Sequence, residues 1–204
     1  MIGVIDYGMG NIQSVVNALE YLGEAARTVK TGGQLAEVDK IILPGVGAFG
    51  EGMKNLNQLG LTAALNTEVL DKKKPFLGIC LGMQLICKES YEFGHHAGLN
   101  WIDASVRRFE DNLNLPVPHV GWNDLAIKKP NQIIVEGSGD VYFVHSYYVD
   151  AATADYCVAT SHYGHDFAAA IEKDNIFATQ FHPEKSQQTG LAMLKRFVRV
   201  PSRA

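Results

Sequence analysis

Short apolar runs alternate with helical patterns through the first half of the chain. Four runs have the composition of buried strands, and they lie at residues 2–5, 25–29, 40–43 and 76–79. We expect Pro44 and Gly45 to end the third run. Between the runs, apolar side chains recur at helical spacing in residues 11–22 and from about residue 53 to 71. Strands and helices that alternate in this way form βαβ units, so the pattern predicts a parallel sheet.

The second half of the chain has a different pattern. β-Branched and aromatic residues concentrate in short segments between turn residues, at 101–110, 117–127, 132–135, 140–149, 156–162, 167–172 and 176–181. These segments predict antiparallel strands attached to, or continuing, the parallel sheet. Residues 186–199 have the spacing of an amphipathic helix. We therefore expect residues 1–204 to form one domain, an α/β fold with an open, mostly parallel sheet, flanking helices and added antiparallel strands.

Composition and charge argue against several classes of protein. Apolar residues make up 47% of the 204 residues, charged residues 20%, and the net charge is −4, which does not favour binding to nucleic acid or to an anionic membrane. No apolar stretch approaches the ~18 residues of a membrane span, and the first residues lack the pattern of a secretion signal. The three cysteines have no C-x-x-C spacing, which argues against structural zinc or a disulfide framework. We expect a cytoplasmic protein.

A nucleophile motif surrounds Cys80. Residues 78–82, Gly-Ile-Cys-Leu-Gly, have the form G-x-C-x-G after a predicted strand and before a helical pattern, the cysteine version of a nucleophile elbow. Glycines allow the chains to pass closely at such a turn, the new helix favours a thiolate, and the Leu81 N–H can donate to an oxyanion. Alone, the motif is equally compatible with a buried structural cysteine, the interpretation we favour for Cys87 and Cys157.

A candidate base and a carboxylate end the last predicted strand. Alternate residues of an extended chain point the same way, so His182 and Glu184 project together, and the carboxylate can hold the imidazole in one tautomer. Alone, a surface histidine beside a surface glutamate is the more frequent situation. Their occurrence together with an elbow cysteine favours a Cys-His-Glu triad.

Residues 45–50 match the glycine pattern G-x-G-x-x-G. A dinucleotide-binding loop would follow the first strand and would have an acidic residue after the next strand, about 20 residues on. Here the run follows a later strand, and Glu68 lies in a helical pattern. A loop whose backbone N–H groups turn toward the elbow fits better.

With these motifs the chain resembles the class I glutamine amidotransferases, which carry G-x-C-x-G-x-Q and a late H-P-E, here residues 78–84 and 182–184. Within that family it is similar to the glutaminase subunits of imidazole glycerol phosphate synthase. That similarity is carried by residues 6–11, 44–49, 119–123 and 142–148. The motifs extend from residue 6 to residue 184, so the resemblance covers nearly the whole chain.

The resemblance implies a flavodoxin-like fold and hydrolysis of L-glutamine through a thioester on Cys80, without metal or organic cofactor. It assigns the oxyanion contacts to backbone N–H groups near Val46 and of Leu81. It assigns glutamine binding to Gly47, Gln84, Glu92, Ser146 and Tyr147. Many members of the family carry a second glycine where this chain has Val46. We hypothesise that this peptide can sit flipped away until a partner docks.

The resemblance also implies a partner. Protonated ammonia is no nucleophile, and the sequence has no second catalytic domain to use it, so a separate synthase subunit is expected. By resemblance this is a (β/α)8-barrel cyclase that forms a heterodimer with the chain in histidine biosynthesis. The interface candidates are Asn11, Trp122, Asn123 and Lys185, although Trp122 is equally compatible with a place in the core. Two alternatives remain: the glutaminase subunit of another synthase, such as that for pyridoxal phosphate, and a non-catalytic elbow-cysteine protein that binds a partner or senses redox state.

Overall fold

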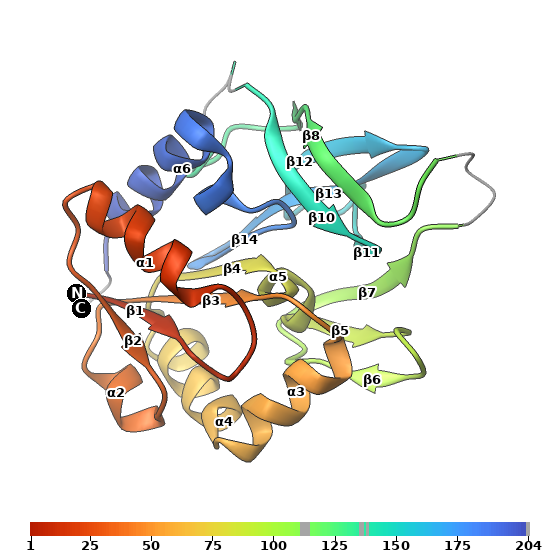
Figure 1. The fold of residues 1–204 in the computed structure, drawn as a ribbon. Helices are drawn as coiled ribbons and strands as arrows, with labels where there is room; N and C mark the ends of the chain where they lie inside the picture. Colours follow the sequence, from red (N-terminus) through yellow and green to blue (C-terminus); the bar gives the residue numbers. More distant parts are fainter. Residues whose placement is uncertain (111–114, 135–136, 138, 203–204) are drawn as a thin grey trace.

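The computed structural model of the chain describes residues 1–110, 115–134, 137 and 139–202, and an eight-stranded sheet lies at its centre (Figure 1). The strand order is β2-β1-β3-β4-β14-β13-β12-β9. The parallel strands are β1 (Ile2–Ile5), β2 (Ala26–Val29), β3 (Lys40–Gly45), β4 (Phe76–Cys80) and β14 (Ile176–Thr179). The antiparallel strands are β13 (His165–Lys173), β12 (Cys157–Tyr163) and β9 (Ala126–Ile127). The expected α/β fold is confirmed, and its parallel half has the flavodoxin-like strand order.

Two smaller sheets pack beside the central one, where the sequence pattern left open whether these strands would continue it. One has the order β11-β7-β5-β6, formed by Tyr147–Asp150, Ile102–Arg108, Cys87–Ser90 and His96–Ala97. The other is the ribbon of β8 (His119–Asn123) and β10 (Val141–His145). Strands β5 and β6 were not expected from the sequence, because each is short and presents polar side chains.

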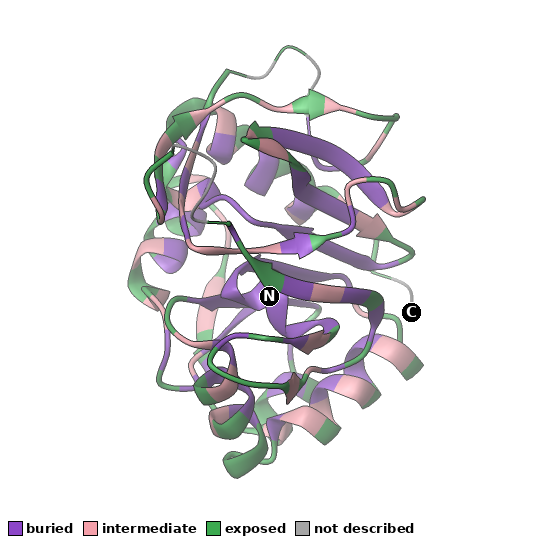
Figure 2. Cartoon of the chain, turned by 90° about the vertical axis from the view of Figure 1, so that its right-hand side faces the viewer, coloured by how far each residue is buried: buried purple, intermediate pink, exposed green. Residues whose placement is uncertain are grey.

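Helices cover both faces of the central sheet. Figure 1 shows α1 (Ile12–Tyr21) and α6 (Gln187–Arg199) on one side, and α2 (Gly32–Ala36), α3 (Phe49–Gln58) and α4 (Leu61–Leu65) on the other. The buried side chains accordingly form two clusters, one on each face of the sheet. Figure 2 shows the buried strands in purple between helices whose outer faces are green. Among the described residues, no helix is long and apolar enough to cross a membrane.

The helical region predicted from about residue 53 to 71 is divided in the structure. Helix α3 starts earlier, at Phe49, and Gly60 then adopts a left-handed conformation with φ 66° that ends the helix before α4. A π-helix, η1 (Asn66–Asp71), follows α4 directly. Glycine adopts positive φ at little cost, so it is the natural breaker here.

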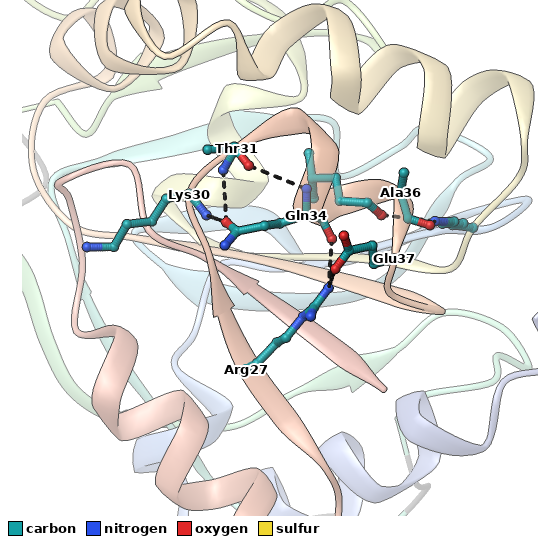
Figure 3. A network of polar contacts seen from close by, with 8 residues as sticks. Arg27, Lys30, Thr31, Gln34, Ala36 and Glu37 are labelled. Carbon is teal, nitrogen blue, oxygen red and sulfur yellow. Dashed lines mark hydrogen bonds and ion pairs between the residues drawn. The ribbon is translucent and has the colours of Figure 1, made fainter.

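Helix α2 was not expected, because its sequence begins with two glycines and shows little periodicity. It is held by local polar contacts instead (Figure 3). Thr31 and Gln34 form a capping box, in which each side chain accepts a hydrogen bond from the other residue's backbone N–H. Arg27 ties the helix to β2 through an ion pair of 2.6 Å with Glu37.

The prediction that β3 ends before Pro44 is wrong. The strand continues through Gly45, and on the β4 side Pro44 pairs with Ile79 and Gly45 with Cys80. Pairing with β1 on the other side stops at Ile42. On the β1 side, where Pro44 is unpaired, no strand needs the N–H group that proline lacks. This extension places Gly45 directly beside Cys80.

Two further strand predictions need correction. Residues 132–134 form no strand, because the N–H groups of Ile133 and Ile134 both donate to the Asn131 side chain, at 3.1 and 2.6 Å, in a turn. Residue 135 lies outside the described residues. The pattern also groups residues 176–181 with the antiparallel segments, but β14 pairs parallel with β4 and antiparallel with β13. Apolar periodicity carries no information on strand direction.

Candidate functional site

The site is built around the sharp turn between β4 and helix α5 (Leu81–Leu85). Cys80 lies at this turn with φ 53° and ψ −107°, a conformation that non-glycine residues rarely adopt. A Cβ atom on Gly82 would lie 1.8 Å from the carbonyl oxygen of Leu43, and one on Gly78 would lie 2.7 Å from that of Gly82. Both glycines of the motif are therefore required by close backbone approach, as an elbow predicts.

The three cysteines differ in their surroundings. All are free and buried, and burial raises the pKa of the Cys87 and Cys157 thiols, which makes them poor nucleophiles. Cys80 lines a cavity, and a histidine and an amide donor lie beside its sulfur. The geometry thus separates the elbow cysteine from the two cysteines that the sequence pattern assigned to the core.

His182 and Glu184 lie together after β14, but not on an extended strand end as the sequence predicts. Strand β14 ends at Thr179, and Glu184 lies in a short 3-10 helix that begins at Pro183. The Nδ1–H of His182 donates to Oε1 of Glu184 at 2.7 Å, and both side chains are only 3% exposed. Burial by itself would lower the pKa of His182, but its interactions with Cys80 and Glu184 outweigh burial and raise that pKa to about 10. This raised pKa favours the imidazolium form of His182 beside the sulfur.

The backbone of His182 is fixed from two sides. Its N–H donates to the carbonyl of Tyr142 on β10 at 2.9 Å, and its carbonyl accepts from the Ser186 hydroxyl at 2.6 Å. Residues Pro183–Lys185 form a short 3-10 helix, η3, which leads into α6. The imidazole Nε2 has no hydrogen bond of normal geometry to any described residue, so this nitrogen is free to exchange a proton at the sulfur.

A cavity of about 370 Å³ opens beside the sulfur. Its lining includes all of the predicted oxyanion and glutamine-binding positions, which are Val46, Gly47, Leu81, Gln84, Glu92, Ser146 and Tyr147. It also includes Phe93, Pro118, Val144 and His145, which the sequence did not single out. Part of the lining comes from the carboxyl ends of β3 and β4, where open α/β sheets bind ligands, and the rest from β10 and from residues after β5 and before β8.

Glu92 is a buried carboxylate in the wall of this cavity. One of its oxygens accepts a hydrogen bond from the backbone N–H of Phe49, the first residue of α3. Burial raises the pKa of Glu92, and that hydrogen bond offsets part of the effect. A cationic ligand group next to this carboxylate would compensate for its lost hydration.

Gln84 uses its amide group within the protein. Its Nε2 donates to the carbonyl of Tyr147 at 2.9 Å and to Oε1 of Gln180 at 3.1 Å, so both of its N–H donors have protein acceptors. Gln180 in turn donates to the Cys80 sulfur at 3.7 Å. Sequence reasoning missed Gln180, which follows β14 directly and stands two residues before His182.

A pair of buried histidines lies at the cavity, with His145 in its lining. Nδ1 of His145 is 2.8 Å from the Tyr147 carbonyl, and Nε2 of His145 is 3.0 Å from Nδ1 of His119. Because a carbonyl only accepts, His145 donates from Nδ1 and accepts from His119. Burial lowers the pKa of His119 to about 4 and that of His145 to about 3. Both rings are therefore neutral at pH 7.

The structure argues against a dinucleotide-binding loop at residues 45–50, because Glu68, the acidic residue that such a loop would use, is not available. Glu68 lies in the π-helix, is 4% exposed and forms ion pairs with Lys72 and Lys74 at 2.8 and 2.7 Å. This carboxylate is therefore buried in a helix and already paired, and does not follow a strand. Gly47 has φ 114° and lines the Cys80 cavity, so the loop belongs to the cysteine site.

Three of the interface candidates lie in or beside the ribbon of β8 and β10. Trp122 is 46% exposed, which excludes the core alternative, and its ring lies 5.9 Å from that of Tyr142. Lys185 Nζ lies 5.9 Å from the same Tyr142 ring. Asn123 donates to the carbonyl of His162 at 2.9 Å. Asn11, the fourth candidate, is exposed and caps α1 through the N–H of Ser14.

No group of three or more His, Cys, Asp or Glu side chains in the described part of the chain is placed to hold a metal ion.

The chain is similar to known proteins over nearly its whole length. The family model for glutamine amidotransferase class-I matches residues 3–200. The imidazole glycerol phosphate synthase subunit HisH 1 of Campylobacter jejuni (strain RM1221) is 48% identical over 98% of this chain and 100% of its own length. The HisH subunit of Aquifex aeolicus (strain VF5) is also 48% identical, over 96% of this chain and 95% of its own.

Solved structures share the fold at lower identity. The PurLQS structure from Thermotoga maritima superposes with a TM-score of 0.74 at 16% identity, covering 97% of this chain and 96% of the matched one. A crystal structure of a glutamine amidotransferase superposes with a TM-score of 0.72 at 21% identity, with the same coverage. The chain belongs to the class I glutamine amidotransferase family, in its HisH branch.

Proposed function

We propose that the chain is the glutaminase subunit of an imidazole glycerol phosphate synthase, which hydrolyses L-glutamine to glutamate and ammonia and passes the ammonia to a cyclase subunit. The observation that carries the proposal is the cavity with Cys80 at a strained elbow and with His182, itself held by Glu184 at 2.7 Å, beside the sulfur. The full-length similarity to HisH subunits supports the choice of synthase.

In the first half-reaction, the Cys80 sulfur attacks the side-chain carbonyl carbon of glutamine. The negative charge that develops on the oxygen is stabilised by the N–H of Leu81 and by an N–H of the loop near Val46. His182, charged as an imidazolium, gives its proton to the departing nitrogen, so ammonia leaves and a γ-glutamyl thioester remains on Cys80.

In the second half-reaction, His182 is neutral and accepts a proton from an attacking water molecule. The resulting tetrahedral intermediate collapses, the C–S bond breaks and glutamate leaves. The sulfur returns as a thiolate beside an imidazolium, which is the starting state. Glu184 keeps the imidazole oriented through both steps. The chemistry uses no metal and no organic cofactor.

Glutamine recognition follows from the cavity lining. The Glu92 carboxylate is the partner for the α-ammonium group, and backbone groups of Ser146 and Tyr147 are the partners for the α-carboxylate. Gly47 lets the loop approach the ligand closely, because it has no side chain and a positive φ. Gln84 acts by holding the Tyr147 carbonyl in place.

The acceptor of ammonia is a separate subunit in this proposal. A (β/α)8-barrel cyclase docks as a heterodimer over the exposed cluster of Trp122, Tyr142 and Lys185, with Asn11 and Asn123 at its margin. The cyclase then receives ammonia before it is protonated in bulk water. An exposed tryptophan packed on a tyrosine is typical of an interface anchor.

The test is ammonia release from glutamine, measured with and without the candidate cyclase and its nucleotide ligand. Labelling by the electrophile diazo-oxonorleucine should add one mass increment on the peptide that contains Cys80. A Cys80→Ala variant should lose both signals, whereas a Cys87→Ala variant should keep them. Absence of labelling with the cyclase present would favour a binding or redox role, and ammonia transfer only to another synthase would change the assigned partner.

A further inference from the structure

A buried glutamine side chain contacts the sulfur from inside the protein. Gln180 follows β14 and is fully buried. Its Nε2 lies 3.7 Å from the Cys80 sulfur and its Oε1 lies 3.1 Å from Nε2 of Gln84. Its backbone N–H donates to the Ala169 carbonyl on β13 at 2.9 Å, which fixes the residue in the sheet. Gln180 is not part of the cavity lining, so its contact is with the sulfur and not with the ligand space.

Hydrogen-bond logic determines which way the Gln180 amide points. The Tyr147 carbonyl can only accept, so Gln84 must turn its NH₂ group toward it. That orientation makes Gln84 a donor to Gln180, and Gln180 must then present its oxygen to Gln84. The Gln180 NH₂ group is consequently left on the side of the sulfur. Reversing the amide would place an oxygen against the sulfur and two NH₂ groups against each other.

A fixed N–H donor favours the charged form of the sulfur. Hydrogen bonds to an anion are stronger than those to its neutral form, above all in a buried site. His182 lies two residues further on, so the imidazole and the amide both reach the sulfur from the short segment that follows β14. We propose that Gln180 is a fourth catalytic residue, which stabilises the Cys80 thiolate and holds it in line with the cavity.

Among the described residues, the titratable groups around the sulfur are His182 with Glu184 behind it, and Tyr7, whose pKa is raised by burial and by its interaction with Cys80. Glu92 and His145 lie in the same cavity lining. A substitution at Gln180 replaces none of these groups. A change in sulfur ionisation in a Gln180 variant therefore reports on the amide itself. The step in glutamine hydrolysis rests on the proposed function, but the ionisation of the sulfur can be measured without it.

The test is the pH dependence of Cys80 alkylation by iodoacetamide, resolved by peptide mass spectrometry in the complex with the cyclase. In Gln180→Met, the midpoint of the alkylation profile should rise by about one pH unit, as expected on loss of one hydrogen bond to an anion. In Gln180→Glu the rise should be at least as large, because a carboxylate repels the thiolate. The same substitutions at the exposed Gln58, at the end of α3, are the matched controls and should leave the profile in place.

Turnover gives a second, independent readout. Because Gln180 touches the sulfur and not the cavity, kcat for glutamine should fall about tenfold or more in Gln180→Met, while KM stays within about twofold. A midpoint that stays at the wild-type pH in a folded Gln180→Met protein would overturn the inference, even if the complex hydrolyses glutamine normally. Conversely, a shifted midpoint in a complex without any glutaminase activity would support Gln180 and reject the proposed function.

A measurement on the unsubstituted chain covers the case in which both variants fail to fold. The side-chain amide ¹⁵N–¹H signals of Gln180 should shift together with the titration of Cys80, because the donor faces the atom whose charge changes. Amide signals of the exposed Gln58 should stay constant over the same range. Gln180 signals that stay constant while Cys80 ionises would show that the amide does not bond to the thiolate.

Discussion

At the scale of single residues, Val46 is the position where this chain departs from the glycine that many family members carry. Its side chain is 42% exposed and lines the cavity, and it stands between Gly45, paired with Cys80, and Gly47 with φ 114°. A β-branched residue narrows the backbone conformations open to the peptide. We therefore expect Val46 to influence which backbone conformation the loop adopts before the partner docks.

Replacing Val46 by glycine should remove this restriction. We expect glutamine hydrolysis by the chain without cyclase to rise about tenfold, which corresponds to ~1.4 kcal/mol in the barrier. Val46→Ala is the matched control, because alanine keeps a Cβ atom and should give a smaller rise. The assay is glutamate formation by the isolated chain. An uncoupled rate that is the same in all three proteins would count against a loop that rests in an inactive state.

The buried histidine pair makes stability depend on pH. The pKa of His119 is lowered to about 4 and that of His145 to about 3, so the folded protein takes up no proton there as the pH falls below about 6.5, whereas the unfolded chain does. The contribution of this pair to the free energy of unfolding therefore falls as the pH decreases from about 6.5 to 4. Each histidine contributes up to ~1.4 kcal/mol per pH unit in this window.

A His119→Gln variant should reduce that slope. Urea unfolding between pH 6.5 and 5 should give a dependence on pH that is smaller by as much as ~1.4 kcal/mol per unit, although the variant is less stable at pH 7. Replacement of the exposed His162 by glutamine is the matched control. An unchanged slope in His119→Gln would mean that the pair is already protonated in the folded state.

Residue-level motifs identified the elbow and the pair of His182 and Glu184 because those functions demand particular residue types at fixed spacing. Gln180 and His145 carry no such signature, since a buried glutamine or histidine is recognisable only by the atoms around it. The sequence could have drawn attention to Gln180 only through its position two residues before His182. Its contact with the sulfur depends on β4 and β14 being neighbours, which is a tertiary fact.

At the scale of elements, the short helix η3 determines where Glu184 lies, and Gly190 of α6 determines where η3 lies. A Cβ atom on Gly190 would be 1.9 Å from the Pro183 carbonyl oxygen. Gly33 of α2 is the opposite case, because nothing lies within 4 Å of its added Cβ. The two glycines occupy helices of the same chain but differ in what surrounds them.

We expect Gly190→Ala to destabilise the protein by ~1–3 kcal/mol, because displacement of backbone outweighs the ~1 kcal/mol that alanine gains in helix propensity. Its glutaminase activity should fall too, since η3 carries Glu184. Gly33→Ala should instead stabilise by ~0.4–1 kcal/mol. Urea unfolding of both variants measures whether each substitution lowers or raises the free energy of unfolding. A stabilised Gly190→Ala protein would mean that η3 moves freely.

The elements that the apolar periodicity did not predict are held by local polar contacts. Helix α2 depends on its capping box, and the turn at residues 131–134 depends on one asparagine side chain. Strands with two buried faces, such as β3 and β4, were predicted within a few residues because each is a continuous apolar run. Even there, the end of β3 depended on which neighbour remained paired.

At the scale of the whole molecule, alternation of strands and helices predicted the layered α/β fold but not how the second half divides into three sheets. That division matters for function, because the ribbon of β8 and β10 connects two places. At one end of the ribbon, His119 pairs with His145 at the cavity. Trp122 lies three positions further along the same strand and pairs with Tyr142 at the surface. A partner bound at Trp122 is thus linked by one pair of strands to the wall of the glutamine site.

The exposed cluster gives the corresponding test of partner binding. Trp122→Ala should raise the Kd for the cyclase at least about thirtyfold, as expected for loss of an aromatic anchor worth ~2 kcal/mol. Tyr21 on α1, 74% exposed, is a matched aromatic control, and Tyr21→Ala should bind normally. The Cys80 alkylation profile of the isolated Trp122→Ala chain should match that of the wild type, because Trp122 does not line the cavity. An unchanged Kd would move the docking surface away from the ribbon, whereas an altered alkylation profile would mean that the substitution disturbs the site without any partner.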